Sequence, residues 1–216
     1  MTLRHSLRHL AVLAFGYALS TVAACGLIGH YRAYDGQPAA ERIIVLFLLP
    51  VTATVIWALI RSLHGRRLTG QENGSADAAI REIVFWIVAC LISIHTLLVG
   101  VLFGIANIEQ WASRGVVVMV GVTLMIVGNY LPRTRPNMAL GIRTSRTLAD
   151  RQLWMLTHRA TGYVAVALGL LTVYAGTFLD RRDVAALPGT AFLISVVVLT
   201  AFYRRAAHVS SRTPSA

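Results

Sequence analysis

Long apolar blocks, separated by short polar segments, dominate the hydropathy pattern of this chain. A helix needs about 20 apolar residues to cross the hydrocarbon core of a bilayer, with roughly 17 to 25 tolerated. Segments that reach this length without Asp, Glu, Lys or Arg are 10–29, 43–60, 83–105, 115–132, 160–179 and 184–203. Backbone groups in lipid must be hydrogen-bonded within the chain, so each segment is predicted to be a helix. The pattern predicts an all-α, polytopic membrane helix bundle with six transmembrane helices.

Composition supports lipid as the solvent. Hydrophobic residues make up 56% of the 216 residues and charged residues only 13%, whereas a soluble domain carries roughly a quarter charged residues. Membrane strands are excluded because the run 43–49 is apolar throughout and does not alternate. The net charge of +11 does not indicate direct nucleic-acid binding, since the arginines lie in short connections between apolar blocks.

The basic residues, all of which are arginine, are distributed unevenly between the two sides of the predicted bundle. Fifteen lie on the side of the N-terminus: Arg4, Arg8, Arg61, Arg66, Arg67, Arg81, Arg133, Arg135, Arg143, Arg146, Arg151, Arg159, Arg204, Arg205 and Arg212. Five lie on the other side: Arg32, Arg42, Arg114, Arg181 and Arg182. The positive-inside rule therefore predicts a bacterial cytoplasmic (inner) membrane protein with both termini in the cytoplasm.

The first apolar segment has two interpretations. Residues 1–9 are basic, and Val22-Ala23-Ala24-Cys25 resembles a lipobox, so cleavage and acylation at Cys25 would remove the first helix. The alternative is an uncleaved first span in which small residues serve helix packing. Cys25 and Cys90 both lie in apolar blocks, and their spacing indicates neither a metal site nor a disulfide framework.

Polar residues are rare within the spans. His95, an intramembrane polar residue near the middle of the third span, is either a proton or ligand contact or an imidazole bonded to a neighbouring helix. No span contains a carboxylate that would complete a proton relay. Gly162 and Gly169 lie seven residues apart on one face of the fifth span, a spacing that favours close helix packing.

The connection between the fourth and fifth spans carries the most specific local signals. Pro132 and Pro136 predict that the fourth span ends near Leu131, and Asn137 favours a turn in which its side chain bonds the backbone. Gly141 supplies a permissive backbone position before Arg143. Arg143 and Arg146 are candidates to bind a lipid phosphate or a carboxylate in forked geometry.

A short interfacial helix is expected within this connection. Thr147 and Asp150 have the spacing of a capping box, which predicts a helix over 148–158. Trp154 is expected at headgroup level, partly hydrated, and Trp154 and His158 share one helical face that docks on the bundle. The segment offers no nucleophile with a paired base and no metal-ligand cluster, so we expect no enzyme activity, no cofactor and no metal.

The same connection resembles the SdpI family of membrane immunity proteins, which protect against a secreted sporulation-delaying toxin. The resemblance lies in seven elements in order: Gly128-Asn129, Pro136-Asn137, Gly141-Ile142-Arg143-Thr144, Thr147-Leu148, Trp154, Thr157-His158-Arg159 and Gly162. Upstream, Asp35-Gly36-Gln37-Pro38 and 47–50 resemble the family's N-terminal region. Ser145-Arg146 departs from the Pro-Trp that is usual after the third element.

The resemblance implies a two-span region at 1–80, a four-span region at 81–206 with the motif loop 128–162, and a disordered cytoplasmic tail at 207–216. It also implies protection against a peptide toxin and sequestration of a cytoplasmic transcriptional repressor at the membrane. The binding or motif residues carried over are Asn129, Pro136, Asn137, Gly141, Arg143, Thr144, Thr147, Trp154, Thr157, His158 and Arg159. Membrane lipid is a further expected partner. The alternative function is a small membrane transporter or exporter, in which His95 would line the path.

Overall fold

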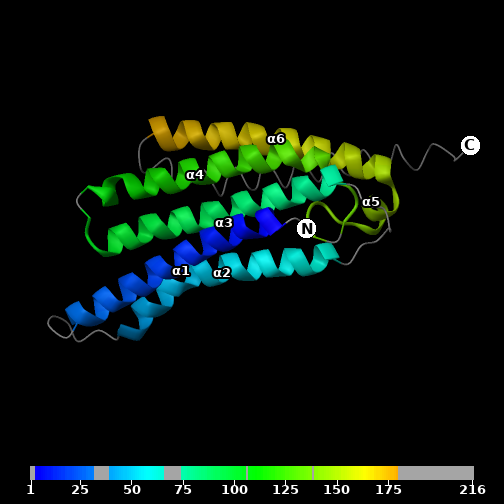
Figure 1. The fold of residues 1–216 in the computed structure, drawn as a ribbon. Helices are drawn as coiled ribbons and strands as arrows, with labels where there is room; N and C mark the ends of the chain where they lie inside the picture. Colours follow the sequence, from blue (N-terminus) through cyan, green and yellow to red (C-terminus); the bar gives the residue numbers. More distant parts are fainter. Residues whose placement is uncertain (1–2, 32–38, 66–73, 106, 138, 180–216) are drawn as a thin grey trace, which may run out of the picture.

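Five long helices form the part of the protein that the computed structural model describes, which is residues 3–31, 39–65, 74–105, 107–137 and 139–179 (Figure 1). They are α1 (Leu3–Tyr31), α2 (Ala39–Gly65), α3 (Gly74–Leu102), α4 (Ile108–Tyr130) and α6 (Arg151–Phe178). A 3-10 turn, η1 (Leu131–Arg133), and the short helix α5 (Ser145–Ala149) lie between α4 and α6. Each long helix contains an apolar stretch sufficient to cross a membrane. The prediction of an all-α, multi-pass membrane bundle is confirmed, while the expected sixth span, 184–203, and the tail lie outside the described residues.

One end of the bundle collects most of the described arginines. The N-terminus of α1, the C-terminus of α2, the N-terminus of α3, and the whole η1–α5 connection lie at this end (Figure 1). It carries Arg8, Arg61, Arg81, Arg133, Arg135, Arg143, Arg146, Arg151 and Arg159, whereas Arg114 lies near the opposite end of α4. We call this the arginine-rich end.

Helices α1, α2 and α3 are held together by interlocking aliphatic side chains. One cluster combines Leu13, Ala53, Ile60, Ile80, Val84, Val88 and Ile92, and a second combines Ala23, Ala24, Leu46 and Val99. Such contacts rest on dispersion and close packing, because lipid tails outside the bundle are as apolar as the core.

A polar contact joins the same three helices in the middle of the bundle. Pro50, inside α2, has no backbone N–H, so the carbonyl of Leu46 four residues earlier has no helical donor. The buried hydroxyl of Ser20 on α1 lies 2.8 Å from that oxygen and 3.0 Å from the carbonyl oxygen of Gly16 in its own helix, and it shares its proton between these two acceptors. With its single proton used, Ser20 Oγ accepts from Nε2–H of His95 on α3, at 2.9 Å. His95 is therefore bonded to a neighbouring helix, as the packing interpretation of the sequence expects.

Helices α4 and α6 meet differently, through glycines that bring the two backbones together. A Cβ on Gly162 would fall 2.6 Å from the carbonyl oxygen of Gly128, and one on Gly128 would fall 2.7 Å from that of Gly162. Gly121 and Gly169 form a second reciprocal pair, at 2.8 and 2.6 Å. The seven-residue spacing that predicted close packing of the fifth span is thus matched by equal spacing on α4.

Two predicted boundaries need correction. The fourth span ends at Tyr130, as expected. The sequence suggested an interfacial helix over 148–158 and a separate span from residue 160. Instead, α6 is one continuous helix that begins at Arg151. The interfacial helix that does exist is α5, which ends at Ala149. Helical hydrogen bonding continues past the hydrocarbon boundary, so charged residues mark where lipid ends and not where the helix begins.

Candidate functional site

The turn at Asn137 fixes the start of the motif loop. Its side-chain amide donates to the carbonyl of Arg135 at 2.7 Å, and its Oδ1 accepts the backbone N–H groups of Ala139 and Leu140 at 2.9 and 2.8 Å. Ala139 and Leu140 in turn pack against the apolar cluster of α1–α3. The expectation that Asn137 bonds its own backbone is confirmed, and the turn also ties the loop to the other half of the bundle.

The capping box is shifted by one turn from the predicted position. Thr144, and not Thr147, is the N-cap of α5: its Oγ1 accepts the N–H of Thr147 at 3.1 Å, and Thr147 Oγ1 accepts the N–H of Thr144 at 2.8 Å. Asp150 is itself the N-cap of α6, accepting from the N–H groups of Gln152 and Leu153. The predicted Thr147–Asp150 pair was wrong because two successive helices, each with its own cap, occupy the segment.

Trp154 and His158 form the buried anchor of the loop. Their rings stack with centroids 3.8 Å apart, and both side chains are fully buried. Trp154 Nε1–H donates to the carbonyl of Thr134 at 3.2 Å, which folds the η1 segment over the first turn of α6. The prediction that both residues dock the helix is confirmed. The prediction of a half-hydrated Trp154 was wrong, because the loop covers the ring.

Gly141 approaches the Nε2 edge of the His158 ring. His158 Nδ1–H donates to the carbonyl of Trp154 at 2.9 Å, so Nε2 carries the lone pair. Gly141 has a φ of 106°, and a Cβ there would collide with His158 Nε2. No hydrogen-bond partner reaches this buried Nε2 among the described residues. Both the backbone conformation and the close approach require glycine.

The remaining motif residues divide into buried supports and exposed groups. Thr157 is buried and its hydroxyl donates to the carbonyl of Leu153 at 2.6 Å. Thr147 is also fully buried, and Pro136 is partly so. Asn129, Arg143 and Arg159 are exposed, and Arg159 Nε–H donates to the hydroxyl of Tyr163 at 3.3 Å. The motif therefore combines an internal scaffold with an outward basic surface.

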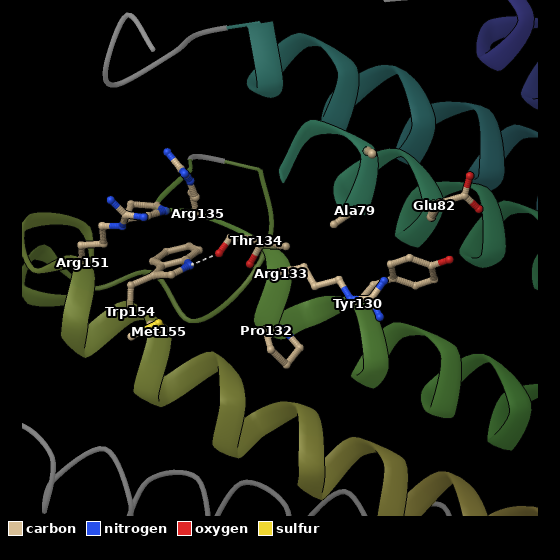
Figure 2. A pocket seen from close by; sticks show the side chains of 12 residues that line it. Ala79, Glu82, Tyr130, Pro132, Arg133, Thr134, Arg135, Arg151, Trp154 and Met155 are labelled. Carbon is tan, nitrogen blue, oxygen red and sulfur yellow. Dashed lines mark hydrogen bonds between the residues drawn. The ribbon is translucent and has the colours of Figure 1, made fainter. Parts of the chain in front are cut away.

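A pocket of about 620 Å³ opens beside the loop at the arginine-rich end (Figure 2). Helix α3 contributes Ala78, Ala79 and Glu82, the end of α4 and the η1 segment contribute Tyr130, Pro132, Arg133, Thr134, Arg135 and Pro136, and α6 contributes Arg151, Trp154 and Met155. The Glu82 carboxylate forms an ion pair with Arg8 of α1, with 3.1 Å between Glu82 Oε1 and Arg8 Nη1. In the described part of the chain, no group of three or more His, Cys, Asp or Glu side chains has metal-binding geometry.

Sequence reasoning missed the pocket and three of the contacts above. The pairing of Gly141 with His158 and the covering of Trp154 by Thr134 depend on contacts between distant residues, which no local pattern reveals. The Ser20–Leu46 bond had a readable signal, because a proline inside an apolar span frees the carbonyl four residues before it.

Comparisons with known proteins agree with the motif. Residues 133–203 match the model of the SdpI/YfhL protein family. The immunity protein SdpI of Bacillus subtilis (strain 168) is 23% identical over 169 residues, which cover 77% of this chain and 78% of that protein. No solved structure matches significantly. The matched segment contains six of the seven motif elements quoted from the sequence, all except Gly128-Asn129.

Proposed function

We propose that this chain, which belongs to the SdpI/YfhL protein family, is a multi-pass membrane immunity protein that protects its cell from a secreted peptide toxin. The immunity role is taken from the name of the Bacillus subtilis relative. The motif loop of this chain supports assigning the same role here. The single observation that carries the proposal is the division of that loop into a buried scaffold and exposed arginines. A surface held in one shape from beneath is suited to recognising a partner.

The arginine distribution supports placing the loop in the cytoplasm and the protein in the inner membrane. In this arrangement the helix bundle meets the toxin, and the exposed motif arginines bind a cytoplasmic transcriptional repressor. Arg143 is an exposed residue between Gly141, whose backbone is left-handed, and the Thr144 cap of α5. Both neighbours restrict the backbone, so the forked donors of Arg143 are presented in a defined direction.

The transporter alternative receives less support. His95, its proposed path residue, is fully buried and bonded to Ser20 between α1 and α3. A side chain engaged in this way serves the contact between helices.

The test is protection of a toxin-sensitive strain that expresses the chain, with survival and membrane retention of a tagged repressor measured together. We expect Arg143→Lys to keep normal protein levels but to reduce repressor retention several-fold, because lysine keeps the charge and loses the fork. Arg114→Lys, at the opposite end, is the matched control. If wild-type chain confers no survival advantage and captures neither peptide nor repressor, the proposed function is overturned.

A further inference from the structure

Two arginines, Arg135 and Arg151, line the pocket beside the motif loop. Figure 2 shows the side chains of Arg135 and Arg151 at the Trp154 end, whereas Arg133 extends toward Tyr130. Arg133 is engaged there, with its guanidinium 5.2 Å from the centre of the Tyr130 ring. Arg135 comes from the segment after η1 and Arg151 from the first turn of α6, so two separate elements present their charges to one space.

Among the described residues, the acidic groups nearby form no ion pair with Arg135 or Arg151. The Glu82 carboxylate in the pocket wall is already paired with Arg8, whose guanidinium also lies 4.1 Å from the centre of the Phe85 ring. Asp150 uses its carboxylate to cap α6. Within the residues that the structure describes, neither Arg135 nor Arg151 forms an ion pair or a side-chain hydrogen bond. Two like charges that line one pocket repel each other, and an anion bound in the pocket would offset that repulsion.

The surroundings of the pair indicate an anion that carries an apolar tail. The pocket lies where two candidate spans end, at Arg133 and at Arg151, which is the depth of lipid headgroups. Met155 lines the pocket and is 52% exposed, and the adjacent Leu156 is 44% exposed, so the α6 wall of the pocket continues into an apolar outer surface. Trp154 forms an inner wall, with its N–H already donated to Thr134.

We propose that Arg135 and Arg151 bind a phosphate group, and that this phosphate belongs to an anionic phospholipid of the surrounding membrane. Guanidinium groups recognise phosphate oxygens through paired N–H donors, and two of them can hold one headgroup from both sides. The acyl chains then run along Met155 and Leu156. The site is independent of toxin or repressor binding and uses neither Arg143 nor His158.

The experiment is a lipid titration of the purified full-length protein in detergent, with bound lipid counted by native mass spectrometry. The probes are dioctanoyl phosphatidylglycerol, dioctanoyl phosphatidylcholine and inorganic phosphate. We expect saturable binding of phosphatidylglycerol, with affinity reduced about fivefold by Arg135→Gln or by Arg151→Gln and about 25-fold by both. Arg61→Gln at the same end and Arg114→Gln at the other end are matched controls, which change the affinity less than twofold.

Each outcome is decisive. If the double glutamine variant binds phosphatidylglycerol as tightly as the control variants do, the site is overturned. If the wild-type protein binds phosphatidylcholine as tightly as phosphatidylglycerol, the choice of an anionic lipid is overturned. Binding of inorganic phosphate as tight as that of phosphatidylglycerol supports the phosphate contact but overturns a lipid source. If the double glutamine variant loses its cooperative thermal transition, Arg135→Lys with Arg151→Lys replaces it. The double lysine variant keeps both charges, so weaker phosphatidylglycerol binding than that of the wild type supports recognition by forked donors. Unchanged binding overturns forked recognition.

Discussion

The two halves of the bundle use opposite means to hold helices together. Helices α1 to α3 meet through two clusters of aliphatic side chains and add a polar contact at Ser20. Helices α4 and α6 bring their backbones into contact at reciprocal glycine pairs. Aliphatic packing tolerates exchange of one side chain for another of similar volume, whereas contact between backbones leaves no volume to exchange. The motif loop connects α4 to α6, so it extends from the pair of helices whose packing tolerates substitution least.

The sharpest test of this contrast is Gly162→Ala. Its Cβ would meet the Gly128 carbonyl and the Pro132 ring, neither of which can turn away. We expect a loss of about 3 kcal/mol, at the upper end of overpacking costs. Gly115→Ala is the matched control, since its Cβ meets only the flexible end of Leu97 at 3.1 Å. Thermal unfolding in detergent measures both, and similar transition temperatures would show that contact with a backbone is no less adaptable than contact with a side chain.

A smaller loss, about 2 kcal/mol, is expected for Gly141→Ala from backbone strain and from collision with His158. The effect concentrates in the loop, so protection in the survival assay should fall further than global stability. His158→Ala removes the ring with which the new Cβ of Gly141→Ala would collide, and leaves only the backbone strain. In the double variant the added loss from Gly141→Ala should therefore shrink to the strain alone. Strict additivity of the two substitutions would show that the ring contact is not formed.

The weakest of the three effects concerns the other half. Ser20→Ala, His95→Ala and the double variant form a cycle, whose coupling energy we expect to be about 0.6 kcal/mol and no more than about 1.7 kcal/mol. Ser20→Ala should cost more than this coupling, because it also leaves the Leu46 carbonyl without a donor. Urea or thermal unfolding of the four proteins gives the numbers. A coupling of zero would mean that His95 and Ser20 do not interact.

Hydropathy alone was sufficient to predict the helical class and five of the spans. The thickness of the bilayer sets the length of an apolar span, and a long apolar segment satisfies its backbone hydrogen bonds in lipid by forming a helix. Proline and asparagine at 132–137 correctly placed the end of α4 and the turn. The sequence misplaced the beginning of α6 and the hydration of Trp154, since both depend on how residues 131–144 fold back over the helix. The pocket arginines come from two elements that adjoin only in three dimensions.

The bond between Ser20 and the Leu46 carbonyl bears on the possible maturation of the chain. Signal-peptidase cleavage ahead of Cys25 would discard Ser20 with the leader, and the proline-interrupted helix would then expose a bare carbonyl to hydrocarbon. An unsatisfied peptide group in that medium costs several kcal/mol. Of the two interpretations of the first apolar segment, the uncleaved span is the one in which the Leu46 carbonyl keeps its Ser20 donor.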